Sequence, residues 1–144
     1  MDKNSLQQIP LKKDLWTLET PDGRPRLIGS RCGNCGEVFF PKKSNGWCVH
    51  CQRRTLEEVL LSPRGRIAAI TVVEQQPAGG FYHGPVPYAY GLVDMPEGVR
   101  VTSLITADNL GAIKVGSEAE LIIRPLYEDQ EGHEVITFMF TPIA

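Results

Sequence analysis

The chain of 144 residues has no long apolar run and no strong net charge, and each absence excludes a class of function. No segment approaches the roughly 18 uninterrupted apolar residues of a membrane span, so we expect no membrane contact. The formal net charge is −2, which gives no overall attraction to nucleic acid. The first residues, Met1-Asp2-Lys3, do not lead into the apolar stretch of a secretory signal. We therefore expect a cytoplasmic, reducing location.

Cysteine is scarce too, and all four residues fall in one motif, C-x2-C-x12-C-x2-C, at Cys32, Cys35, Cys48 and Cys51. A gap of two residues lets one tight turn aim both sulfurs of a pair at one point. Two such turns supply the four ligands of a tetrahedral metal. Gly33 and Gly36 suit the backbone of the first turn. The motif predicts a closed zinc site with four thiolate ligands. Rubredoxin-type iron stays open, and paired disulfides are disfavoured in a reducing compartment.

The cysteine motif also limits what the chain can catalyse. Zinc held by four thiolates has no open position for water or substrate, so we expect the metal to stabilise the fold and not to act as a Lewis acid. No cysteine remains to serve as a nucleophile. We therefore expect no catalytic residue in this chain, and no activity of the chain alone.

Two segments precede the C-terminal part of the chain. Residues 1–24 carry a short helical pattern, with Leu11, Leu15 and Leu18 at positions i, i+4 and i+7 and Trp16 beside them. A helix this short is marginal alone, so we expect it to dock on its own domain or on a partner. Residues 25–56 are predicted to form a zinc ribbon, because short apolar runs enter and leave the first cysteine pair. Such a small module depends on its metal to fold.

Residues 57–144 have an all-β pattern with five predicted strands: Arg66–Glu74, Tyr88–Met95, Arg100–Thr106, Glu118–Tyr127 and Glu134–Thr141. A tight turn at Pro96-Glu97-Gly98 joins the second strand to the third, and Asp108–Ile113 reads as a helical turn between the third and the fourth. This order is typical of an OB-fold barrel. The predicted fold class is therefore mainly β, with an N-terminal helix, a rubredoxin-like zinc ribbon and a five-stranded OB-fold barrel.

Several stretches between about residue 10 and residue 127 match a known family in their order along the chain: Arg26–Cys32, Phe40-Pro41, Cys48–Cys51, Gly65–Ile67, Gly80-Phe81, Pro87-Tyr88, Gly91–Asp94, Gly98–Arg100 and Val115-Gly116. On these stretches the chain resembles the zinc-ribbon/OB-fold proteins that accompany thiolases and other acyl-CoA enzymes. The resemblance implies a non-catalytic zinc-binding subunit that helps to assemble a heteromeric complex with a thiolase-fold partner and to bind or channel a coenzyme A thioester. Within the family, the chain looks most like the small subunits of thiolases that act on aromatic acyl-CoA, such as benzoylsuccinyl-CoA, in anaerobic aromatic degradation.

Candidate residues for contact with the CoA ester lie in a loop and on a strand. The segment Glu74–Pro87 is long and rich in proline and glycine, and it carries Phe81 and Tyr82, which we expect to line an acyl channel or to cap the barrel. The phosphates of coenzyme A need cations, which three basic pairs offer: Lys42-Lys43, Arg53-Arg54, and Arg64 with Arg66. Of these pairs, we expect Arg64 and Arg66 to lie near the mouth of the barrel and to contact the CoA ester.

Two functions from other classes remain open on the sequence alone. Zinc ribbons and OB barrels also occur together in single-stranded nucleic-acid-binding proteins, in which aromatic side chains stack on bases. The acidic pI of about 5.9 and the lack of a basic stripe disfavour that function, so we expect no nucleic-acid partner. A redox protein with rubredoxin-type iron is the other candidate, and a red colour of the purified protein would identify it.

Overall fold

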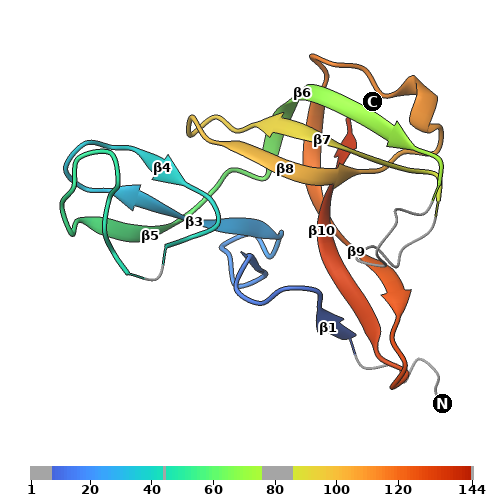
Figure 1. Cartoon of the computed structure of the whole chain (residues 1–144), viewed down its shortest axis with the longest axis horizontal. Coiled ribbons are helices and arrows are strands. Elements are labelled where there is room, and N and C mark those ends of the chain that lie inside the picture. The colour runs from blue at the N-terminus through green and yellow to red at the C-terminus, as the bar shows by residue number, and fades with distance from the viewer. Residues whose placement is uncertain (1–7, 44, 76–85, 144) are drawn as a thin grey trace.

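The described part of the chain, residues 8–43, 45–75 and 86–143 of a computed structural model, is built almost wholly from β-strands (Figure 1). The ten strands are β1 (Gln8–Pro10), β2 (Trp16–Thr17), β3 (Arg26–Cys32), β4 (Val38–Phe39), β5 (Leu56–Leu60), β6 (Arg64–Val73), β7 (Tyr88–Asp94), β8 (Arg100–Ile105), β9 (Glu118–Glu128) and β10 (Glu134–Pro142). A single 3-10 turn, η1 (Leu110–Ala112), lies between β8 and β9. Within these described residues, no helix is long and apolar enough to cross a membrane.

Five strands close the barrel that the sequence predicts. Strand β6 pairs with β7, β7 with β8, β8 with β10, β10 with β9, and β9 returns to β6. The β8–β10 pairing is parallel and the other four are antiparallel. Alternating side chains of β10 fill the interior, where Phe140 is fully buried beside Ile67, Val93 and Ile105. The prediction of an OB-fold barrel with a helical turn between its third and fourth strands is confirmed.

The ribbon lies at the other end of the molecule and is centred on β3 (Figure 1). Strands β4 and β5 pair with β3 on its two sides. Leu27 of β3 and Leu61, which follows β5, are fully buried in the same core cluster as the barrel residues. Behind them, Glu97 in the β7–β8 turn accepts hydrogen bonds from the backbone N–H and the hydroxyl of Ser62, at 2.9 and 2.8 Å. Ribbon and barrel are therefore held together by a shared core and by this carboxylate.

The prediction of an N-terminal helix is wrong. Strand β1 runs parallel to β10, and Leu11 donates its N–H to the carbonyl of Ile136 at 2.8 Å. Strand β2 pairs with β3, and Asp14 between the two strands has a φ of 65°, which no α-helix contains. The sheets offer the backbone of this segment longer-range partners, whereas so short a helix gains little stability by itself.

The apolar side chains of this segment also separate from the predicted stripe. Leu11 and Leu18 are exposed, whereas Leu15 and Trp16 pack against the core. The ring of Trp16 lies edge-on to Phe138 at 6.4 Å, and Phe40 of the ribbon meets the same ring at 5.9 Å. Trp16 and Phe40 thus serve the chain's own core, which leaves less of this surface free for a partner than the sequence suggests.

Candidate metal centre and barrel pocket

Two matching backbone turns present the four cysteines. Cys32 ends β3, and Gly36 donates its N–H to the carbonyl of Cys32 at 2.9 Å. In the second turn, Gln52 donates to the carbonyl of Cys48 at 2.7 Å. Gly36 and Gln52 have φ values of 81° and 61°, so each turn closes through a residue in the left-handed region four positions after its first cysteine. The sequence identified the glycine of the first turn and missed Gln52, which fills this role without being glycine.

The four sulfurs converge as a tetrahedral metal requires. All four Sγ atoms lie within 4.8 Å of one another. The Sγ–Sγ distances are 3.5 Å between Cys32 and Cys51 and 3.7 Å between Cys35 and Cys48. A zinc–sulfur bond of about 2.3 Å in a regular tetrahedron puts sulfurs about 3.8 Å apart. The thiols are free of disulfides, and their arrangement fits a structural metal that leaves no open coordination position.

Hydrogen bonds to Cys32 favour its thiolate. The Thr55 hydroxyl lies 3.0 Å from the Cys32 Sγ, and the N–H groups of Asn34 and Cys35 donate to the same sulfur at 3.3 Å. The Thr55 hydrogen bond, aided by these amides and opposed by burial, lowers the pKa of Cys32 to about 5. Thr55 was not predicted to support the site, because the sequence marks it only by its position four residues after Cys51.

The pKa of Cys35 shifts in the opposite direction, upward. A hydrogen bond from the backbone of Glu37 lowers the pKa of Cys35, but burial and hydrogen bonding with Cys32, Cys48 and Cys51 outweigh it and raise the pKa to about 12. Four thiols this close do not all ionise unless a cation lies among them. A bound divalent metal supplies that charge and holds all four as thiolates.

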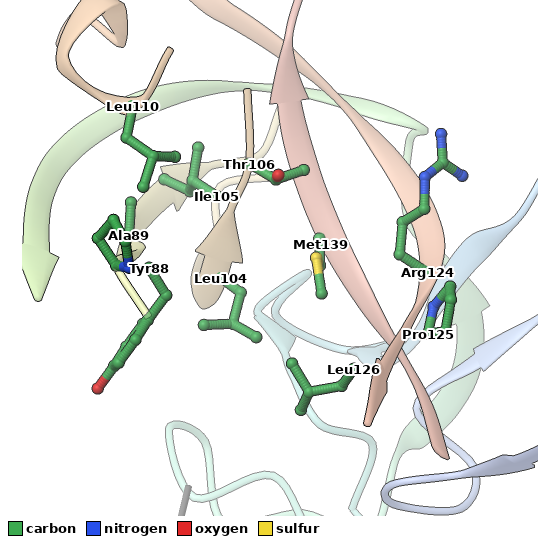
Figure 2. Close-up of a pocket in the computed structure, with 11 residues that line it drawn as sticks. Tyr88, Ala89, Leu104, Ile105, Thr106, Leu110, Arg124, Pro125, Leu126 and Met139 are labelled. Atoms are coloured by element: carbon green, nitrogen blue, oxygen red, sulfur yellow. The ribbon is translucent and has the colours of Figure 1, made fainter. Parts of the chain in front are cut away.

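A second feature is an apolar pocket of about 300 Å³ at the barrel surface. Leu104 of β8, Leu126 of β9 and Met139 of β10 form its wall, with Leu110 of η1 above them (Figure 2). Tyr88 lies at one end of the pocket and Arg124 at the other. These side chains offer an apolar group a place among aliphatic walls.

Two tyrosines extend the rim of the pocket along β7. The rings of Tyr88 and Tyr90, which alternate around Ala89 and therefore lie on one face of the strand, stack with centroids 6.3 Å apart, and Tyr90 is exposed. Phe81 and Tyr82, which the sequence places in the loop before this strand, lie outside the described residues.

Arg64 and Arg66 lie on the strand that precedes that loop in the sequence. Both are at the start of β6, whereas the loop follows the other end of this ten-residue strand. They line a surface hollow that also contains Asp94 and Glu118, and Arg66 donates to the carbonyl of Gly116 at 2.6 Å. Because residues 76–85 lie outside the described residues, the joint contact of the aromatic loop and these arginines with the CoA ester stays a prediction.

A group of Asp129, Glu131 and His133 at the tip of the β9–β10 hairpin also lies within metal-ligand reach. The Asp129 carboxylate accepts the backbone N–H groups of Glu131 and His133 at 3.0 and 2.7 Å. The hydrogen bond from the His133 backbone is the main cause of the lowered pKa of Asp129. These contacts identify Asp129 as the cap of a tight turn.

Both halves of the chain match known domains. A rubredoxin-like zinc ribbon domain named for ChsH2 matches residues 22–57, and the C-terminal OB-fold domain of ChsH2 matches residues 58–124. The aldolase structure titled Ltp2-ChsH2(DUF35) superposes with a TM-score of 0.63 at 24% identity, covering 81% of this chain and 84% of that one. This likeness supports the fold.

Curated relatives give the family. A DUF35 domain-containing scaffold protein of Methanothermobacter thermautotrophicus is 36% identical over 83% of this chain and 88% of its own length. A second scaffold protein, from Methanocaldococcus jannaschii, is 33% identical over 81% and 82%. The benzoylsuccinyl-CoA thiolase subunit BbsA of Thauera aromatica is 33% identical over 88% of this chain and 84% of its own. The chain therefore belongs to the DUF35 family of zinc-ribbon/OB-fold proteins, as its motifs predict.

Proposed function

We propose that this chain is a non-catalytic, zinc-binding subunit of a thiolase-type enzyme that acts on a CoA thioester. The observation that carries the proposal is the convergence of all four cysteines of the chain on one closed site. A thiolase needs a free cysteine nucleophile, and here no thiol is left to supply it, so the partner subunit provides the catalytic residues. Cys32, Cys35, Cys48 and Cys51 would each give one thiolate to a zinc ion, which stabilises the ribbon and takes no part in the chemistry.

The described roles of the relatives support this assignment. BbsA is described as a subunit of benzoylsuccinyl-CoA thiolase, and its counterpart in Geobacter metallireducens is 29% identical over 88% of this chain. The archaeal relatives are described as scaffold proteins, which also agrees with a role in assembly. We extend to this chain the class of partner, a thiolase-fold subunit, and the class of ligand, an aromatic acyl-CoA. No relative described above favours binding of single-stranded nucleic acid.

The barrel pocket suggests how the chain contributes to the CoA ester. Its aliphatic wall of Leu104, Leu126 and Met139 and its rim at Tyr88 suit an apolar acyl group. Pro87 and Tyr88 line the pocket and end the segment 79–88, so the proposed passage for the acyl group runs along this segment with Phe81 and Tyr82. Arg64 and Arg66 lie beside two carboxylates in their own hollow, which makes them the weaker part of the predicted CoA contact.

The test compares turnover by the subunit alone with turnover by the assembled enzyme. We expect the purified chain to convert no acyl-CoA, and the complex with its thiolase-fold partner to cleave an aromatic 3-oxoacyl-CoA in the presence of free CoA. Within that complex, Phe81→Ala is expected to lower kcat/KM about two- to tenfold, the loss of one ring contact, with unchanged zinc content and assembly. Turnover by the chain alone would overturn the proposal, and wild-type kinetics of Phe81→Ala would remove the passage from it.

A further inference from the structure

Three basic pairs were candidates for an anionic ligand, and two of them are occupied by other contacts. Lys42 forms an ion pair with Glu58 at 3.0 Å, and the Nζ of Lys43 lies 5.1 Å from the centre of the Phe39 ring. Arg66 donates to the carbonyl of Gly116, and the hollow that it shares with Arg64 also contains the carboxylates of Asp94 and Glu118. Within the part of the chain that the structure describes, Arg53 and Arg54 are both exposed and form no ion pair. This leaves one basic pair with two free guanidinium groups.

The second knuckle, which carries this pair, also carries the most exposed aromatic ring of the ribbon. Cys48 and Arg53 form an antiparallel bridge, with the N–H of Cys48 donating to the carbonyl of Arg53 at 2.8 Å. The Arg54 side chain lies against Gly46, the residue before Trp47, with its Cγ about 3.6 Å from where a Cβ on Gly46 would be. Trp47 is 49% exposed and makes no contribution to the core, unlike Trp16. The second knuckle thus carries a half-exposed indole ring and two exposed guanidinium groups within eight residues of the sequence.

We propose that this surface, Trp47 with Arg53 and Arg54, binds the adenine nucleotide end of coenzyme A. An indole stacks on a purine base, and guanidinium groups form charge-assisted, often bidentate hydrogen bonds with phosphate oxygens. Coenzyme A carries both chemical features next to each other, an adenine and phosphates on its ribose. Hydrogen bonds of Cys48 with Gln52 and with Arg53 close the hairpin, and a metal held by Cys48 and Cys51 would fix its base, so the three side chains are presented on a backbone that is ordered before the ligand arrives.

The inference names a subsite for the ligand class in the proposed function and rests on it for the choice of coenzyme A. The two fail separately. If the chain does not bind the nucleotide, its proposed role as a thiolase subunit still stands, and if no partner is found, this binding is still measurable on the chain alone.

The experiment follows the fluorescence of Trp47 in the full-length, zinc-loaded chain carrying Trp16→Phe. Titration with CoA and with 3′-phosphoadenosine 5′-phosphate is expected to quench the fluorescence saturably, with a Kd of about 0.1–1 mM, and pantetheine is expected to leave it unchanged. By calorimetry, Trp47→Ala should weaken nucleotide binding about five- to 150-fold. Arg54→Gln should weaken it and flatten its dependence on salt. Arg31→Gln, at an exposed arginine of the first knuckle, is the matched control that should bind like the wild type, and Arg64→Gln tests the competing site on the barrel.

Three results would overturn the proposal. One is no saturable quenching up to about 10 mM nucleotide, well above the expected range. The second is a loss of binding in Arg64→Gln with none in Arg54→Gln, which would place the phosphates on the barrel. The third is binding of a single-stranded oligo(dA) at least tenfold tighter than CoA, which would identify nucleic acid as the source of the base and phosphates.

Discussion

Cys48→Ser is expected to abolish metal binding and to unfold the ribbon while the barrel stays folded. Cys48 is fully buried, and its sulfur lies 3.7 Å from that of Cys35, so serine removes one of four ligands from the interior of the site. Binding of structural zinc contributes about 10–16 kcal/mol to small modules of this kind, as much as or more than the whole stability of a typical domain. The three short strands around β3 bury too little apolar surface to fold without it.

Elemental analysis and amide hydrogen exchange measure these two effects together. The wild type should carry one zinc per chain and protect β3 and β5 from exchange, whereas Cys48→Ser should carry none and protect only the barrel strands. His50→Ala is the matched control in the same turn: His50 is exposed, and its removal should leave the zinc in place. Retention of metal by Cys48→Ser together with its loss from His50→Ala would show that the ligand set is not four thiolates.

Gly91→Ala is expected to destabilise the barrel by about 3 kcal/mol or more. A Cβ on Gly91 would lie 2.0 Å from the carbonyl oxygen of Ala69 and 2.9 Å from its carbonyl carbon. Both atoms belong to the backbone of β6, so no side chain can turn aside to relieve the clash. They lie at the irregular pairing where the β6–β7 register shifts between Ile67 and Ala69. The methyl group would have to move one strand of the closed barrel away from its neighbour.

Chemical denaturation followed through the barrel transition tests this prediction. Gly111→Ala is the control, since the nearest atom to its Cβ is a side-chain oxygen of Asn109 at 3.4 Å. Its stability should lie within about 0.5 kcal/mol of the wild type. An equally small effect of Gly91→Ala would show that β6 and β7 separate easily at this point.

The barrel was predictable because the local sequence pattern of each strand indicates where it lies. Strands β7, β8, β9 and β10 begin at the residues predicted for them, since alternating apolar side chains and the Pro96-Glu97-Gly98 turn fix where each strand starts. The N-terminal segment was not, because its leucine spacing fits a helix, whereas its backbone pairs with other strands: β1 with β10, more than a hundred residues away, and β2 with β3. Periodicity carries no information about such a partner.

The metal site was predictable to the same degree and for a similar reason. Ligand spacing within one short segment nearly determines a four-cysteine cluster, so the four sulfurs converge as predicted. The residues that support the cysteines could not be predicted from their spacing. Gln52 closes a turn that a glycine would be expected to close, and the Thr55 hydroxyl reaches Cys32 across the ribbon. No local pattern predicts how Arg64 and Arg66 lie relative to the aromatic loop, and residues 76–85 of that loop lie outside the described residues, so this contact stays a prediction.

Native mass spectrometry of the protein purified from its own host tests the central claim most directly. The proposed function predicts a hetero-oligomer in which this chain, with one zinc, accompanies a thiolase-fold subunit through every native step, and in which only the assembled species cleaves an acyl-CoA. A zinc-loaded monomer that no enzyme accompanies, in cells that are making their acyl-CoA thiolases, would contradict it.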